Sequence, residues 1–223
     1  MNSPTSLSIK FWGTRGSIPC PGPDTIKYGG NTTCFEITCG DKRVIIDAGT
    51  GIRLLGKKIM LEEKNLLDAD LFFTHTHMDH IQGLPFFAPL YNPNSNVRLH
   101  AGHLAGDKYD LHGIIGTMLM KDPVFPVPSA LIEKACSFND YDCGHEFSLE
   151  GGITIKTGQL NHPNGACGYR IEFAPILNTL KIGLMKMWLP LLKMPILWCT
   201  TQLTPMRSIK ILKVGVIQLG RKH

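Results

Sequence analysis

The stretch LFFTHTHMDHIQGLP, residues 71–85, decides how the rest of the chain is interpreted. It begins as an apolar run, which predicts a buried strand, and then places three histidines and an aspartate within six positions. Residues two apart in an extended segment point the same way, so His75 and His77 are expected to converge on one ion. Asp79 and His80 follow where the chain turns toward a helix, and we expect them to face a second ion nearby. Imidazole and carboxylate ligands suit zinc and similar metals, so the stretch predicts a metal site rather than a polar surface turn.

Length and composition are those of one globular domain. The chain has 223 residues, of which 43% are hydrophobic. The first residues show no basic start followed by an apolar run, and no apolar stretch approaches the length of a membrane span, so we expect neither a signal peptide nor a membrane anchor. Seven cysteines without a C-x-x-C pair predict reduced thiols and a cytoplasmic location. Cys34 and Cys39 are expected to face opposite sides of one strand.

The positive charge of the chain is confined to its C-terminal part. The formal net charge is +5, yet all 18 acidic residues lie at or before Glu172. Residues 173–223 contain eight Lys or Arg and no acid, which leaves 15 basic residues and a net charge of −3 in residues 1–172. The overall charge therefore says little about the folded domain, and nucleic acid is expected as a partner only if it is the substrate.

The character of the sequence changes near residue 172. Residues 1–172 have the pattern of one strand-rich domain, whereas residues 173–223 form a basic, acid-free tail whose prolines interrupt every candidate helix. Within the domain, alternating or continuous apolar runs predict strands, and helical spacing predicts two helices. The expected strands are 6–12, 34–39, 42–47, 69–75, 96–102, 153–160 and 168–173, and the expected helices are 52–65 and 107–122.

The histidine-rich stretch and several other motifs resemble one known family. The pattern H-x-H-x-D-H at residues 75–80 is similar to the metal-binding pattern of the metallo-β-lactamase superfamily. The segments FWGTRGSIPCPGP, YGGNTTC, IIDAGTGIRLLG, IQGLPFF and LNHPNGACGYRIE look like its phosphodiesterase and ribonuclease Z-like branch, in order, over residues 7–172. The resemblance implies an α/β fold, a four-layer αββα sandwich with metals at one edge between two sheets, whose C-terminal part is incomplete in this chain.

The resemblance also implies which residues bind metal. His75, His77 and His162 would bind the first ion, with His162 in the loop NHP between two expected strands. Asp79 and His80 would supply part of the second site, and Asp79 would be the catalytic residue. The remaining histidines show no ligand spacing and are interpreted as incidental: His100, His103, His112, His145 and His223.

Two further expectations concern the surroundings of the metals. Asp47, at the end of an apolar run, would be a buried acid whose hydrogen bonds order the metal loop. Arg15 and the backbone N–H groups of Gly29, Gly30 and Asn31 could meet phosphate oxygens of a substrate, although a plain turn with a solvated arginine explains them equally well.

Two ligands of the family pattern are missing from this sequence. The family has an aspartate in a Thr-Asp-Thr/Ser setting after the strand that corresponds to YRIE, and this aspartate bridges both ions. It also has a histidine near the C-terminus, commonly in Gly-His-Ser. No Asp or Glu follows Glu172 here, and the next histidine after His162 is His223. The second metal site therefore has two protein ligands and no bridge.

Back-translation of the tail indicates a change of reading frame near residue 173. When the third base of each codon is read with the first two of the next, residues 173–179 permit Cys-Thr-Asp-Thr-Glu-His. Residues 213–220 likewise permit Gly-Trp-Gly-His-Ser-Thr-Trp, so both missing ligands reappear in the expected motifs. We interpret the tail as an out-of-frame product, and a genuine divergent tail that packs as helices or binds a partner is the alternative.

The function that the resemblance implies is metal-dependent hydrolysis. A metal-activated hydroxide would attack an electrophilic centre while the ions stabilise the developing charge. A small-molecule or nucleotide phosphodiester is the expected substrate, and up to two zinc ions, or manganese or iron, are the expected cofactors. Three alternatives stay open: a hydrolase of thioesters, lactones or β-lactams, a catalytically impaired remnant with one metal at three histidines, and an adaptor that binds through the basic tail. The oligomeric state is left open, and a dimer is compatible with the sequence.

Overall fold

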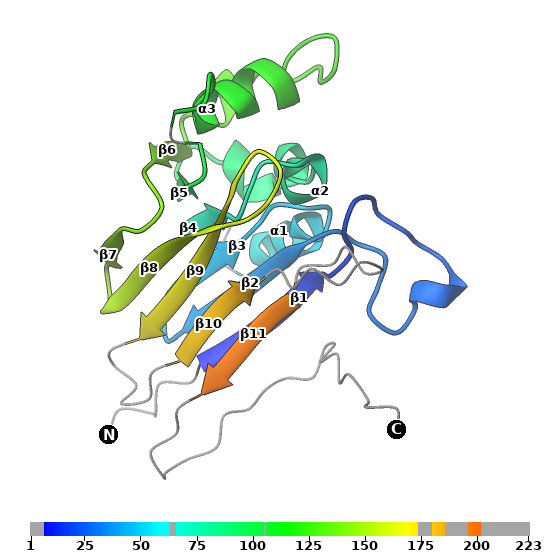
Figure 1. The fold of residues 1–223 in the computed structure, drawn as a ribbon. Helices are drawn as coiled ribbons and strands as arrows, with labels where there is room; N and C mark the ends of the chain where they lie inside the picture. Colours follow the sequence, from blue (N-terminus) through cyan, green and yellow to red (C-terminus); the bar gives the residue numbers. More distant parts are fainter. Residues whose placement is uncertain (1–6, 63–65, 105, 174–179, 186–195, 202–223) are drawn as a thin grey trace.

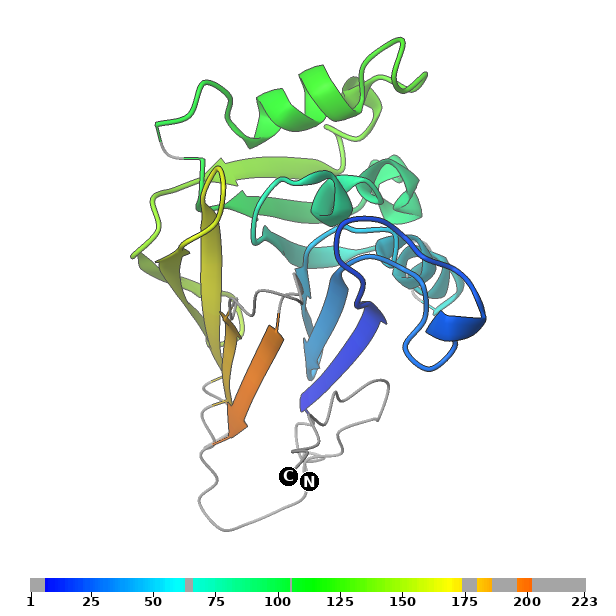
Figure 2. The same cartoon turned by 45° about the vertical axis from the view of Figure 1, so that its right-hand side comes forward.

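Two β-sheets face each other, and helices lie on the outer face of the first sheet (Figure 1 and Figure 2). In this computed structural model, residues 7–62, 66–104, 106–173, 180–185 and 196–201 are described. The expected fold class, an α/β sandwich with two central sheets, is confirmed. The described residues form three of the four expected layers, namely one layer of helices and the two sheets. The described helices all pack on the first sheet.

The first sheet has six strands in sequence order. Its first three strands pair antiparallel, and the pairs from the third strand to the sixth are parallel. The carboxyl ends of parallel strands lie at one edge of a sheet, so the loops that follow them meet there. The strands are β1 (Leu7–Gly13), β2 (Cys34–Cys39), β3 (Lys42–Ile46), β4 (Asp68–Phe73), β5 (Asn96–Ala101) and β6 (Cys136–Asp140).

The second sheet is antiparallel and has fewer strands than the first. Strands β7 (Glu146–Leu149), β8 (Ile153–Leu160) and β9 (Ala166–Phe173) pair in sequence order. In the tail, β10 (Leu180–Met185) and β11 (Ile196–Thr201) pair with each other, and β10 lies beside β9 in both views. These two tail segments are strands, so the alternative in which the tail packs as helices does not describe them. Residues 174–179, 186–195 and 202–223, which carry most of the reading-frame interpretation, lie outside the described residues.

The alternating strands of the first sheet divide the core into two parts. In β4, Leu71 and Phe73 face the helices, whereas Phe72 faces the second sheet. The same alternation separates Cys34, on the helix side, from Cys39, on the side of the second sheet, as the sequence predicted. One face of the first sheet therefore packs against helices, and the other closes the sandwich.

The helices are few and short. Helix α1 (Ile52–Glu62) packs on the first sheet, α2 (Met78–Ile81) follows the histidine-rich stretch, and α3 (Leu111–Gly113) continues as a π-helical turn over Ile114–Leu119. None of the helices in the described part of the chain has the length and apolar character needed to span a bilayer. Single-turn 3₁₀ helices cover Pro23–Thr25, Leu84–Phe86, Ala88–Tyr91 and Ser129–Leu131.

The secondary structure expected from the sequence needs three corrections, one helix start and two missed strands. The expected helix 107–122 begins only at Leu111, because the Asp110 side chain accepts the backbone N–H of Gly113 at 2.7 Å and caps it there. Strand β6, with the sequence CSFND, was missed because it is an edge strand whose two apolar residues, Cys136 and Phe138, are too few to show a period. Strand β7, with the sequence EFSL, was missed because four residues are too few to show a period.

Replacing Phe72 by alanine is expected to destabilise the sandwich by about 3 to 5 kcal/mol. The Phe72 ring is fully buried and stacks on His100 with 4.3 Å between ring centroids, so its removal leaves a cavity between the sheets. Phe86→Ala is the matched control, because Phe86 is 57% exposed, and its cost is expected to stay below about 1 kcal/mol. Urea unfolding of both variants measures the difference, and equal losses would contradict the assignment of Phe72 to the core.

Candidate metal centre

Three of the predicted metal ligands converge at the edge of the sheets where β4 ends. His75 and His77 follow β4 directly, and His162 lies in the turn between β8 and β9. One ring nitrogen from each histidine lies within 4.8 Å of the other two, and His162 Nε2 is 3.1 Å from His77 Nδ1. Within the described residues, they form a group of three side chains that could hold a metal ion.

The arrangement of the three histidines fits one tetrahedral zinc ion. Nitrogens bound at about 2.1 Å in a tetrahedron lie about 3.4 Å apart, so small movements of the rings are sufficient. His75 is buried, whereas His77 and His162 are half-buried, which leaves one side of the group accessible from solvent. A site with three protein ligands and an accessible side is typical of catalytic zinc.

Two hydrogen bonds bring His162 to a strand far away in the sequence. The backbone N–H of Cys167, in β9, donates to Thr74 O at 2.7 Å, immediately before His75. The hydroxyl of Tyr169 donates to Phe73 O at 2.6 Å. The start of β9 is therefore attached to the end of β4, and the turn that precedes β9 is held over the ligand loop.

The residue types in the turn that carries His162 suit the backbone conformation of that turn. The backbone N–H of Gly165 donates to His162 O at 2.9 Å and closes a four-residue turn. Pro163 has the fixed φ that suits the second position of such a turn, and Asn164 tolerates the positive φ of 62° observed at the third. Local sequence thus shapes the turn, and the pairing of β9 decides where it points.

Asp47 lies buried beneath the ligand loop and hydrogen-bonds to it. Its carboxylate is 1% exposed and accepts the backbone N–H of Thr74 at 2.8 Å and the Thr74 hydroxyl at 2.9 Å. It also lies 2.7 Å from His80 Nδ1. Asp47 has a φ of 61°, a conformation that costs free energy in a residue with a side chain and is concentrated at functional sites.

Close backbone packing brings the Asp47 loop against the ligand loop. A Cβ on Gly83 would lie 2.1 Å from Gly49 O, so neither a larger residue nor a shifted loop fits there. Ala48 donates its N–H to His80 O at 2.7 Å and accepts the N–H of Gly83 at 2.8 Å. The glycine in IQGLP is thus required by close approach of two loops.

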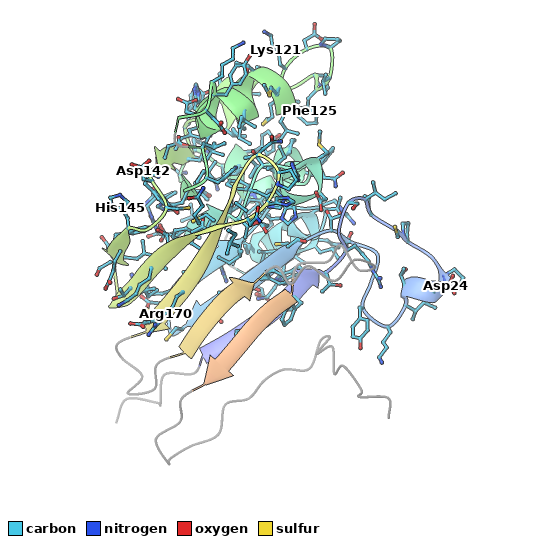
Figure 3. The ribbon with its side chains drawn as sticks, viewed as in Figure 1. Asp24, Lys121, Phe125, Asp142, His145 and Arg170 are labelled. Atoms are coloured by element: carbon cyan, nitrogen blue, oxygen red, sulfur yellow. The ribbon has the colours of Figure 1, made fainter. Side chains whose placement is uncertain are left out.

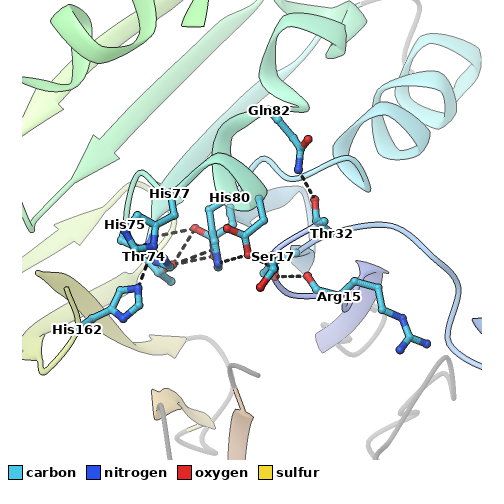
Figure 4. Close-up of polar contacts among 12 residues, drawn as sticks. Arg15, Ser17, Thr32, Thr74, His75, His77, His80, Gln82 and His162 are labelled. Atoms are coloured by element: carbon cyan, nitrogen blue, oxygen red, sulfur yellow. Dashed lines mark hydrogen bonds and ion pairs between the residues drawn. The ribbon is translucent and has the colours of Figure 1, made fainter. Parts of the chain in front are cut away.

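Asp79 and His80 form a charged pair next to the three histidines. His80 Nε2 lies 3.3 Å from Asp79 Oδ2, and the His80 and His75 ring centroids are 4.0 Å apart. The backbone N–H of Ser17 donates to Asp79 Oδ2 at 2.8 Å (Figure 4). The structure therefore brings the two predicted ligands of a second ion together, beside the first site and without a third protein ligand among the described residues.

Electrostatics fix the protonation of this pair in the metal-free protein. Burial lowers the pKa of His80, but the carboxylates of Asp47 and Asp79 outweigh it and raise the pKa to about 9. Burial raises the pKa of Asp79, but the hydrogen bond and charge of His80 and the Ser17 N–H hold it well below the usual range. At neutral pH the pair is an imidazolium and a carboxylate.

The predicted phosphate-binding segments hydrogen-bond to each other. The Arg15 guanidinium points away from the histidines and donates through Nε to Gly29 O at 2.9 Å (Figure 4). Asn31 accepts two backbone N–H groups, those of Thr14 and Arg15, and its side-chain oxygen accepts the Thr50 hydroxyl at 3.2 Å. The structure does not bring Arg15, Gly29, Gly30 or Asn31 into the histidine group, and their contact with phosphate remains a prediction.

Sequence reasoning missed several residues that shape the site. The Thr74 hydroxyl contacts Asp47 and also lies 3.1 Å from His75 Nδ1. Its position between the strand and the first histidine is the one feature of the sequence that could have indicated this role. Ser17 acts through its backbone, which leaves no signal in residue type. His103 was interpreted as incidental, yet its Nε2 lies 3.1 Å from the Thr76 hydroxyl, and burial lowers its pKa to about 4.

The sequence matches no protein-family model, but solved structures share its fold. YhfI from Bacillus subtilis, a metallo-β-lactamase fold protein, gives a TM-score of 0.52 at 14% identity, over 76% of this chain and 58% of that one. Unliganded yeast PDE1 gives 0.52 at 12% identity, over 75% of this chain and 62% of that one. A diphosphatase from the PhnP family gives 0.51 at 18% identity, with 75% and 62% covered.

These similarities establish the architecture. The chain has the metallo-β-lactamase fold, as its motifs predicted, and the histidine group lies at the edge between the two sheets where the resemblance placed the metals. The chain spans 58% to 62% of the length of these three proteins.

Proposed function

We propose that this metallo-β-lactamase-fold protein is a metal-dependent hydrolase whose substrates are phosphodiesters. One observation carries the proposal: His75, His77 and His162, from two segments far apart in sequence, each place one ring nitrogen within 4.8 Å of the other two. Such a group at a partly exposed edge has the ligand number and type of a catalytic zinc site. A diphosphatase among the similar structures supports substrates that contain phosphate.

The protein would hold zinc through these three imidazoles and orient them through hydrogen bonds. Thr74 lies within hydrogen-bond distance of His75 Nδ1, and Asp47 fixes Thr74, so the first ligand is held from the buried side. Bound zinc supplies Lewis acidity, which activates water and stabilises negative charge on a phosphoryl group. Manganese and iron are alternative ions for the same nitrogens.

Asp79 is the residue that we propose as catalytic. Its low pKa keeps it ionised at neutral pH, and the Ser17 N–H holds the carboxylate beside His80 at the rim of the histidine group. In that position it can accept a hydrogen bond from a water molecule, or bind a second cation together with His80 once His80 has lost its proton. Arg15 and the backbone around Gly29 to Asn31 are proposed to meet the substrate only in a complex, since the Arg15 side chain points away from the histidines (Figure 4).

The cellular setting is proposed from the cysteines. The six described cysteines are all free thiols, including Cys143 and Cys167, whose sulfurs both lie close to Gly102. Unpaired thiols fit a reducing compartment, so we propose that the protein acts in the cytoplasm.

Hydrolysis of bis-p-nitrophenyl phosphate by the full chain tests the proposal. We expect turnover after loading with zinc or manganese, loss of turnover with a chelator, and its return when the ion is added back. Nitrocefin and a thioester serve as competing substrates, and faster turnover of either would replace the phosphodiester assignment. A chain that binds zinc stoichiometrically and hydrolyses none of the three would contradict the proposed activity.

A second candidate is a protein that binds one metal with little turnover. It is favoured by the absence of any acid after Glu172 and by the single group of three ligands among the described residues. This candidate predicts about one zinc ion per chain, whereas an enzyme with two ions predicts about two. Metal analysis after saturation with zinc and removal of unbound ions by gel filtration separates them.

A further inference from the structure

His103 lies where no ligand spacing predicted a role. It follows strand β5 and Gly102, in the loop that leads toward α3, and is half-buried. Its Nδ1 is buried and has no hydrogen-bond partner within the described part of the chain, so Thr76 provides the polar contact of the ring. A buried ring with one polar contact is held in place chiefly by that contact and by packing.

The first link joins His103 to the ligand loop. His103 Nε2 lies 3.1 Å from Oγ1 of Thr76, the residue between His75 and His77. With Nε2–H as donor to this hydroxyl, Nδ1 is a bare acceptor, which is the tautomer that avoids a buried unpaired N–H. The bond restrains Thr76 and, through the backbone on either side, the two histidines of the loop.

The second link joins His103 to the turn that carries His162. A Cβ built on Gly165 would lie 3.3 Å from His103 O and 3.8 Å from His103 Cβ, so the turn packs directly on this residue. Gly165 itself has a φ of 75°. Gly102, the residue before His103, is in close contact with β9, since a Cβ built on it would lie 2.8 Å from Cys167 Sγ.

We propose that His103 is a positioning residue for the metal centre. It sets the distance between His162 and the pair His75 and His77. This inference rests on the proposed function, because it treats the three histidines as metal ligands. His103 contacts both segments that supply these ligands, one through its ring and the other through its backbone and Cβ. Loss of the ring contact would let the loop move relative to the turn, and a looser ligand set binds its ion less tightly.

Zinc affinity, measured by competition with a chromophoric chelator, tests the role without relying on activity. His103→Ala in the full chain is expected to weaken zinc binding roughly tenfold, the lower end of the effect of residues that orient metal ligands. His103→Gln retains a side-chain donor and is expected to recover most of the affinity. His112→Ala is the control, because His112 is exposed and pairs with Glu133 at 3.1 Å on another part of the surface.

A double-mutant cycle with Thr76→Val separates positioning from general loss of structure. Both changes remove the same hydrogen bond, so the double variant is expected to bind zinc about as well as either single variant. Additive losses, or unchanged affinity in His103→Ala, would overturn the proposal. So would failure of His103→Gln to recover affinity when its metal-free thermal midpoint equals that of the wild type.

The same measurements distinguish this inference from the proposed function. Zinc binding that depends on His103, in a chain that hydrolyses no substrate, would contradict the hydrolase and support the positioning role. Hydrolysis and tight zinc binding that are both unaffected by His103→Ala would support the hydrolase and refute the positioning role. A wild-type chain that binds no zinc would refute both.

Discussion

Replacing His162 by alanine is expected to weaken zinc binding by on the order of a hundredfold. Structural zinc sites bind with roughly 10 to 16 kcal/mol shared among four ligands, so one imidazole accounts for about 3 kcal/mol. His162 is the ligand from the second sheet, and its Nε2 lies 3.1 Å from His77 Nδ1. Its loss leaves two ligands on one short loop. Chelator competition gives the affinity, and hydrolysis of bis-p-nitrophenyl phosphate is expected to fall in parallel at limiting zinc.

A matched control separates the metal effect from loss of a surface histidine. His145 is exposed, and its side chain lies in the loop between β6 and β7, on the outside of the molecule (Figure 3). His145→Ala is expected to retain the zinc affinity and thermal midpoint of the wild type. Equal zinc affinity in the two variants would remove His162 from the ligand set and, with it, the observation on which the proposed function depends.

Replacing Asp47 by asparagine is expected to destabilise the metal-free protein by about 3 kcal/mol at pH 6, because the change leaves the buried His80 cation without its closest carboxylate. Asparagine has nearly the same shape and tolerates the positive φ of 61°, so the loss is electrostatic rather than conformational. Urea unfolding in the presence of a chelator measures it. Asp24→Asn, in the exposed 3₁₀ helix Pro23–Thr25 (Figure 3), is the control and is expected to change stability by less than about 0.5 kcal/mol.

The same variant has a defined pH dependence. The pKa of His80 is raised from 6.5 to about 9 in the folded protein, so its contribution is fully present below pH 6.5 and is lost as the pH rises through 9. The contribution corresponds to about 3 kcal/mol at its maximum. Wild-type, metal-free protein is therefore expected to lose stability between pH 6.5 and 9, and Asp47→Asn to show a flatter profile. Parallel profiles for the two proteins would contradict the assignment of Asp47 as the partner of His80.

The local part of the metal centre follows from the amino-acid sequence alone. In H-x-H-x-D-H, all of the spacing lies within six residues, so backbone geometry alone brings His75 near His77 and Asp79 near His80. The strands around this stretch were likewise predictable, because buried strands carry continuous or alternating apolar residues. A regular apolar pattern within one segment predicts its secondary structure, and the strands that the structure confirms are those whose sequences show such a pattern.

Contacts between distant segments were decided by tertiary structure. His162 reaches the ligand loop because β9 is attached to the end of β4 through the bond from Cys167 to Thr74, and no residue spacing encodes that attachment. The partner of Asp79 is a backbone N–H, that of Ser17, which any residue type could supply. His103 meets the site through Thr76 and Gly165 without ligand spacing of its own. Sequence patterns report periodicity along one segment, whereas these contacts depend on sheet pairing and on loops brought together from different strands.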